Sequence, residues 1–175
     1  MTGTTGPTLL FLDVDGPLIP FGGTGYREAP VPRGNEGDPG GNPLLARLDP
    51  GHGARLTALR CDLVWATTWM GEANEYVAPR IGLPELPVVA WPDTTEEDER
   101  ADEDGRAGIH WKTRTLVEWA SERPFLWVDD EITPADRAWV AAHHPAPTLL
   151  HRVDPRTGLI DRDFATLARW VRDHP

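Results

Sequence analysis

Residues 8–16 read Thr-Leu-Leu-Phe-Leu-Asp-Val-Asp-Gly, and this stretch says more than any other about how the chain folds. The apolar run 9–12 is short, continuous and followed by a turn signal, which is typical of a strand buried on both faces of a parallel sheet. In open α/β sheets, ligands bind just beyond the carboxyl ends of such strands. We therefore expect Asp13 and Asp15 at a ligand-binding edge, where Gly16 permits a sharp turn of the chain.

The carboxylates of Asp13 and Asp15 repel each other unless a positive charge lies between them. A divalent cation would remove this repulsion, and ligand sets made only of oxygen atoms favour Mg²⁺. The alternative interpretation is an Asp-rich turn that binds nothing, and the motif by itself leaves both interpretations open.

Length and composition predict one domain, residues 1–175, which is long enough to bury a core. The net charge of −11 argues against broad binding to a nucleic-acid backbone, although it leaves room for a local basic site. No apolar stretch reaches the roughly 18 residues of a membrane span, and the first residues lack the features of a signal peptide. The single cysteine, Cys61, excludes an internal disulfide, so we expect a cytoplasmic protein without membrane partners.

Lysine usage is unusual, because Lys112 is the one lysine among 17 basic residues. Lysine carries a compact point charge, whereas the arginine side chain ends in a broad planar group. A crowded site that holds phosphate and carboxylates would favour the smaller group. The alternative is a chance lysine on a solvated helix face, and the count alone does not decide between the two.

Strand and helix patterns alternate along the chain, which predicts an α/β fold with a five-stranded, mainly parallel sheet. We expect strands at 9–12, 63–66, 86–90, 124–128 and 148–153, and helices at 44–59 with a break near Pro50-Gly51, at 72–79, 111–120, 134–143 and 161–172. The Gly/Pro-rich stretch 17–43 predicts a loop. The acidic run 93–106 predicts a mobile, solvated loop.

Residues capable of chemistry follow the predicted elements in a distinctive order: Asp13 and Asp15, Thr67 and Thr68, Lys112 at a helix start, then Asp129 and Asp130. This order resembles the four motifs of haloacid-dehalogenase-like (HAD) phosphohydrolases, over about residues 8–152. The resemblance implies a three-layer Rossmannoid fold. Pro17 departs from the family pattern, in which small polar or β-branched residues are commoner. Response-regulator receivers also use acids, a hydroxyl residue and a lysine at strand ends, but in a different order.

Further segments are similar to a bacterial HAD subgroup that includes the capless HAD domain of RNA-repair polypeptides. These segments are Leu63–Trp69 followed by Ala73-Asn74, then Phe125–Glu131, and Gly158-Leu159 before the last predicted helix. The likeness implies a phosphatase that acts on nucleotides or nucleic-acid ends.

The resemblance to HAD enzymes implies a role for each motif residue. Asp13 would attack phosphorus and form an aspartyl-phosphate, and Asp15 would protonate the leaving oxygen and then activate water. Thr67 would bind a phosphoryl oxygen, with Thr68 as the second choice. Lys112 would neutralise Asp13 and the phosphoryl group.

The same resemblance implies Mg²⁺ as the cofactor. Its ligands would be Asp13, the backbone carbonyl of Asp15, and Asp129, with Asp130 bound directly or through water. The alternative to a Mg²⁺-dependent phosphatase is a catalytically silent binding module with the same fold. The intact motif acids and Lys112 favour the enzyme.

The kind of phosphorylated substrate stays open at this point. Both intervals in which HAD enzymes insert a cap are short here, so we expect no large cap and an open site, which suits large substrates or chain ends. The acidic run 93–106 would repel polyanions if it lay over the site. Trp69 and Trp111 flank the threonine and lysine motifs, and could either stack on a substrate ring or pack in the core.

Overall fold

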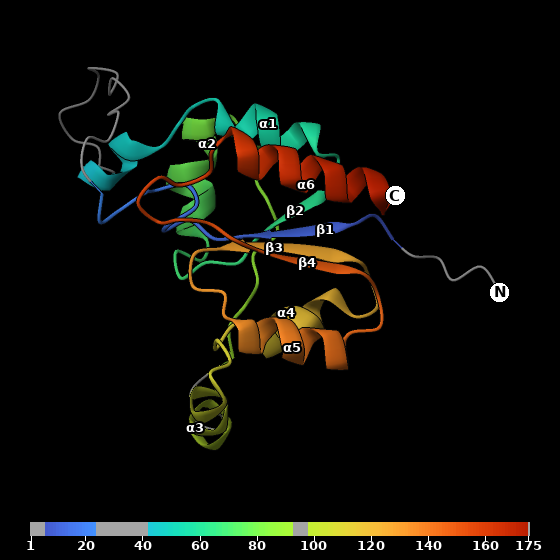
Figure 1. The fold of residues 1–175 in the computed structure, drawn as a ribbon. Coiled ribbons are helices and arrows are strands. Elements are labelled where there is room, and N and C mark those ends of the chain that lie inside the picture. The colour runs from blue at the N-terminus through green and yellow to red at the C-terminus, as the bar shows by residue number, and fades with distance from the viewer. Residues whose placement is uncertain (1–5, 24–41, 93–97, 175) are drawn as a thin grey trace.

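Four parallel strands form the sheet in a computed structural model, which describes residues 6–23, 42–92 and 98–174. In spatial order these are β2 (Asp62–Trp65), β1 (Leu9–Leu12), β3 (Phe125–Asp129) and β4 (Thr148–Arg152) (Figure 1). Every residue of β1 is buried, as the apolar run predicts. Leu12 pairs with Trp65 on one side and with Val128 on the other, so three strands end at the same edge.

Helices cover both faces of this sheet, which gives a three-layer α/β arrangement (Figure 1). The helices are η1 (Pro43–Arg47), α1 (His52–Ala58), η2 (Ala73–Val77), α2 (Ala78–Ile81), α3 (Asp98–Ala107), α4 (Thr113–Ala120), α5 (Pro134–His143) and α6 (Asp161–Asp173). Because strand side chains alternate between faces, Leu10 and Leu12 pack in the core under α1 and α6. Leu9 and Phe11 pack in the opposite core, under α4 and α5.

The prediction of a fifth strand at 86–90 is wrong. This segment pairs with β2 through a single bridge to Trp65. Pro87 has no N–H with which to extend a ladder, and the N–H of Leu86 donates to Asn74 Oδ1 at 2.9 Å instead. The sheet of the described residues therefore has four strands, with 86–90 lying along its edge as an irregular segment.

The prediction of a loop over 93–106 is wrong for its second part, because residues 98–107 form α3. Alanine, glutamate and arginine in this run favour helix despite the high charge. An ion pair then attaches the helix to α4: Asp104 is buried, and Arg114 Nε donates to its Oδ2 at 2.7 Å. Residues 93–97 lie outside the described residues.

Two smaller predictions can also be compared with the structure. In the loop predicted for 17–43, residues 17–23 contain no helix, and 24–41 lie outside the described residues. The helix expected to stop near Pro79 continues to Ile81, because Pro79 occupies the first turn of α2, where its missing N–H is not needed.

No separate cap domain is seen in the part of the chain that the structure describes. Between β1 and β2, η1 and α1 contribute Leu45 and Leu56 to the core on their face of the sheet. Between β2 and α4, η2 and α2 contribute Val77 and Ile81 to the same core. Among the described helices, none is both long and apolar enough to cross a membrane.

Asn74 fastens the segment 86–90 to β2, so its removal should weaken the fold. Its Oδ1 accepts from Trp65 Nε1 at 2.7 Å, and its Nδ2 donates to Leu86 O at 2.8 Å. We expect Asn74→Ala to lower the free energy of unfolding by about 1–3 kcal/mol, because the buried Trp65 N–H loses its acceptor. The exposed neighbour Glu75 provides the control, and Glu75→Ala should change stability by no more than about 0.5 kcal/mol. Equal losses in urea denaturation would contradict this role for Asn74.

Candidate active site

The polar positions that follow the strands meet at the carboxyl edge of the sheet. β1 leads into Asp13 and Asp15, and β2 leads into Thr67 and Thr68. β3 ends at Asp129, which Asp130 follows, and Lys112 immediately precedes α4. Backbone hydrogen bonds hold these ends level, since Asp13 N donates to Val128 O at 3.1 Å and Ala66 N donates to Leu12 O at 2.9 Å. The parallel register thus gathers residues that are far apart in the sequence.

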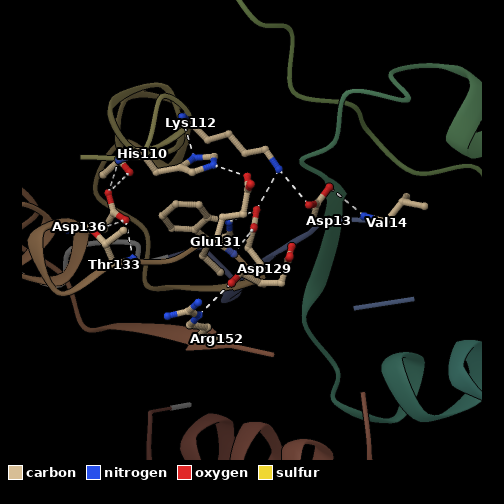
Figure 2. A network of polar contacts seen from close by, with 12 residues as sticks. Asp13, Val14, His110, Lys112, Asp129, Glu131, Thr133, Asp136 and Arg152 are labelled. Atoms are coloured by element: carbon tan, nitrogen blue, oxygen red, sulfur yellow. Dashed lines mark hydrogen bonds and ion pairs between the residues drawn. The ribbon is translucent and has the colours of Figure 1, made fainter. Parts of the chain in front are cut away.

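Lys112 joins the ends of β1 and β3, as Figure 2 shows. Its Nζ lies 2.8 Å from Asp129 Oδ2 and 3.1 Å from Asp13 Oδ2, and all three side chains are buried. Backbone groups bind the other carboxylate oxygens: Val14 N donates to Asp13 Oδ1 at 2.9 Å, and Glu131 N donates to Asp129 Oδ1 at 3.0 Å. The one lysine is therefore the centre of a buried ion-pair cluster and does not lie on a solvated helix face.

The cluster holds more negative charge than Lys112 can neutralise. Burial raises the pKa of Asp13 to about 7, although Lys112 opposes this shift, and the charge of Asp129 adds to it. Burial also raises the pKa of Asp130 to about 6, again with a contribution from Asp129. For Lys112, burial disfavours the charged form, but the carboxylates of Asp13 and Asp129 outweigh it and raise its pKa. Three carboxylates and one ammonium leave two negative charges, which one divalent cation would neutralise.

The donor atoms of Asp13, Asp129 and Asp130 suit a hard divalent cation. One carboxylate oxygen of each residue lies within 4.8 Å of the other two. Such an all-oxygen set favours Mg²⁺, the ion that the motif resemblance implies. A second group combines Asp129 with His110 and Glu131, but His110 Nε2 and Glu131 Oε2 already pair with each other at 2.9 Å.

Gly16 meets Asp130 where the chain turns after β1. Its φ is +94°, and a Cβ added there would lie 2.6 Å from both Cγ and Oδ1 of Asp130. Gly16 N donates to Ile19 O at 3.0 Å and closes the turn. The glycine therefore has two functions: it permits the turn, and it leaves space for the Asp130 carboxylate.

Asp15 and the two threonines lie at the β2 side of the same edge. Trp69 Nε1 donates to Asp15 Oδ2 at 3.0 Å, which fixes the orientation of this carboxylate. Thr67 is fully buried and its Oγ1 accepts from Trp69 N at 3.2 Å, whereas Thr68 is exposed. Among the described residues, the Asp15 side chain lies outside the carboxylate groups that could hold an ion, so its backbone carbonyl is left as the predicted ligand.

Sequence reasoning did not single out Asp136, which holds the turn that presents Lys112 (Figure 2). Asp136 is fully buried, and its Oδ1 accepts from His110 N and from Thr113 Oγ1, each at 2.7 Å. Its Oδ2 accepts from Thr133 N at 2.7 Å. The Thr-x-x-Asp spacing at 133–136 predicts a capping box at the start of α5, but it does not predict the contact with the turn before α4.

His110, Glu131 and Arg152 also border the site without having been predicted. His110 Nδ1 accepts from Lys112 N at 3.2 Å, which leaves Nε2 to donate to Glu131 Oε2. Arg152 Nε donates to the carbonyl of Asp130 at 2.8 Å. In the sequence, His110 and Glu131 are distinguished by their closeness to motif residues, whereas nothing marks Arg152.

Asp13→Asn should stabilise the metal-free protein at pH 8. The folded state raises the Asp13 pKa from 3.8 to about 7, so between these values it binds more protons than the unfolded chain, and stability falls as pH rises. Asparagine removes this cost. In the presence of a chelator, we expect Tm at pH 8 to rise by about 2–4 °C for each kcal/mol recovered, and the gain to shrink toward pH 4. A Tm at pH 8 that is unchanged or lower would contradict the charge imbalance.

Gly16→Ala should weaken Mg²⁺ binding, because the new methyl group displaces the Asp130 carboxylate. The matched control is Gly82→Ala, which has a similar φ of +78° but nothing within 4 Å of the added Cβ. Both variants carry backbone strain, and Gly16→Ala alone carries the clash. In calorimetric Mg²⁺ titrations we expect Gly16→Ala to lose about ten- to a hundredfold in Mg²⁺ affinity, which is the loss typical of changes to groups that position a metal ligand. Gly82→Ala should bind like wild type, and equal affinities for all three proteins would refute the assignment.

Comparison with known families agrees with the motif order and with this geometry. Residues 9–164 match the family described as "HAD domain in Swiss Army Knife RNA repair proteins". The match runs from β1 into α6 and includes every motif residue at the carboxyl edge. No curated protein and no solved structure matches the chain. Because the family match covers most of its length, the chain belongs to the HAD domains of Swiss Army Knife RNA repair proteins.

Proposed function

We propose that this chain is a Mg²⁺-dependent phosphatase, which hydrolyses phosphate monoesters through a phosphoryl group carried on Asp13. The observation that supports this most strongly is the buried Lys112 between Asp13 and Asp129, with Asp130 beside them. This cluster combines a carboxylate nucleophile, a cation for the phosphoryl oxygens and hard oxygen ligands. Membership of the HAD family supports the hydrolase class.

Asp13 and Asp15 divide the chemistry of the two steps between them. An oxygen of Asp13 attacks phosphorus, the bond from phosphorus to the ester oxygen breaks, and Asp15 donates its proton to the leaving oxygen. In the second step Asp15 takes a proton from water, the water oxygen attacks phosphorus, and the bond to Asp13 breaks to release inorganic phosphate. The hydrogen bond from Trp69 Nε1 holds the Asp15 carboxylate in place for both proton transfers.

The positive charges of the site balance the phosphoryl group and its nucleophile. Lys112 is held by Asp13 and Asp129, so its ammonium group is ready to meet a phosphoryl oxygen without reorganisation. Mg²⁺ would be held by Asp13, the backbone carbonyl of Asp15, Asp129 and Asp130. When bound, this ion would supply the charge that keeps Asp13 ionised and stabilises the phosphoryl oxygens.

A binding module without turnover is the second candidate, and the electrostatics argue against it. The raised pKa of Asp13 means that its charge costs stability in the folded protein. A module that only binds partners could replace Asp13 with a neutral residue and avoid this cost, as functional sites commonly trade stability for activity. The description of the family, which refers to RNA repair, supports nucleotides or nucleic-acid ends as the phosphorylated substrates.

A hydrolysis assay tests the proposal, with a generic phosphate ester followed by nucleotides, sugar phosphates and phosphorylated RNA or DNA ends. We expect activity with Mg²⁺ and none in excess chelator, and no turnover by Asp13→Asn. Lys112→Arg should lose about a hundredfold or more in kcat, because the wider guanidinium crowds the phosphoryl group. As its control, Arg156→Lys exchanges the same residue types at an exposed ion pair and should keep full activity.

Activity that survives chelation or the loss of Asp13 would overturn the mechanism. Full activity in Lys112→Arg would remove the central role of the lysine. A wild-type protein that hydrolyses none of these esters in the presence of Mg²⁺ would favour the silent binding module.

A further inference from the structure

Trp111 is a large aromatic side chain that stays exposed beside the buried cluster. Its relative exposure is 48%, the highest among the exposed large apolar residues of the described chain. It directly precedes Lys112, and the Lys112 Nζ lies 5.6 Å from the centre of the Trp111 ring. The same Nζ lies 3.1 Å from Asp13 Oδ2. A phosphate monoester held between Asp13 and Lys112 would therefore place its esterified group close to this ring.

Trp91 holds the Trp111 ring in position. The two rings meet edge to face, with centroids 4.8 Å apart and an angle of 72° between their planes. Trp91 is itself fixed, because its Nε1 donates to the carbonyl of Thr67 at 3.1 Å. The pair thus connects the Thr67 turn with the turn that presents Lys112, and the support of Trp91 makes the exposed ring a rigid surface.

Two other tryptophans that reach the surface, Trp69 and Trp119, have partners that account for them. Trp69 donates its Nε1 to Asp15, and its ring packs against the core under α1 and α6. Trp119 is 38% exposed, but its ring packs edge to face on Phe11 with centroids 5.5 Å apart. Among these three, Trp111 combines high exposure with closeness to the reacting groups.

We propose that Trp111, supported by Trp91, is the surface on which a nucleobase of the substrate stacks while the adjacent phosphate lies at Asp13. This inference rests on the proposed phosphatase function and names its substrate class. Stacking on aromatic side chains is tolerant of sequence, since every base offers a flat face. The surroundings also suit a neutral base better than further phosphates, because a negatively charged side chain lies nearby. The His110 ring lies 5.6 Å from the Trp111 ring, and the exposed carboxylate of Glu131 pairs with His110.

Two sources supply this chemistry, a free mononucleotide and the phosphorylated end of a strand. Both place one phosphate next to one base, and the experiment below distinguishes them.

The test is a binding experiment in an Asp13→Asn background, which prevents turnover. Calorimetry with Mg²⁺ compares adenosine monophosphate with ribose 5-phosphate, which lacks the base. We expect the monophosphate to bind more tightly, and Trp111→Ala to reduce this preference about tenfold or more, as loss of a stacking residue usually does. Trp111→Phe should restore most of the preference. Trp119→Ala is the matched control, because it removes an exposed tryptophan that packs on Phe11. It should leave the preference for the monophosphate unchanged.

A missing preference for the monophosphate, or a preference that Trp111→Ala leaves intact, would overturn the proposal. A short oligonucleotide with a terminal phosphate forms the second arm. Binding tighter than that of the monophosphate, and lost in Trp111→Ala, identifies a strand end, whereas equal or weaker binding identifies a free nucleotide. Because binding is measured without turnover, a base preference in a protein that hydrolyses nothing would refute the phosphatase alone. Hydrolysis without a base preference would refute the stacking role alone.

Discussion

One buried ammonium group holds together the carboxylates at the carboxyl edge of the sheet. Lys112 Nζ lies between the carboxylates of Asp13 and Asp129, which end two neighbouring strands. Loss of Lys112 would leave both carboxylates without their cation, and removal of one partner from a buried ion pair typically costs about 3–5 kcal/mol. The two carboxylates therefore depend on the lysine, and the parallel register of β1 and β3 determines where the three groups meet.

The residues around this cluster position the charges but do not neutralise them. Asp136 ties the turn before Lys112 to the start of α5, and Gly16 leaves space for Asp130 beside the first turn of the chain. Burial, with a smaller contribution from Asp129, raises the pKa of Asp13 and of Asp130, so the ionised carboxylates carry a cost in the folded protein. Natural sites often keep such a cost because function requires it, and here a divalent cation and a phosphoryl group would together use this arrangement.

Local patterns in the sequence were enough to predict the buried strand β1 and the polar residues at its end. The apolar run 9–12 and the acids that follow it mark β1 and its edge, and the motif order places Lys112 beside them. The errors come from long-range contacts. The run 86–90 is apolar enough for a strand, but Asn74 takes the Leu86 N–H, and no local pattern reveals that bond. The high charge of the run 93–106 predicted a loop, but residues 98–107 form α3, which an ion pair attaches to α4. The contact of Asp136 with the turn before Lys112 likewise joins separate elements, so spacing alone could not predict it.

The most direct test of the account is to locate the phosphoryl group during turnover. With an aryl phosphate whose leaving oxygen departs without a proton, Asp15→Asn should slow only the second step, because the group that activates water is lost, so a covalent intermediate should accumulate. The variant would be mixed with Mg²⁺ and this ester, quenched in acid, digested, and mapped by mass spectrometry. We predict one phosphate on the peptide that contains residues 8–16, carried by Asp13. Phosphate on another residue, or no covalent phosphate while the ester is consumed, would contradict it.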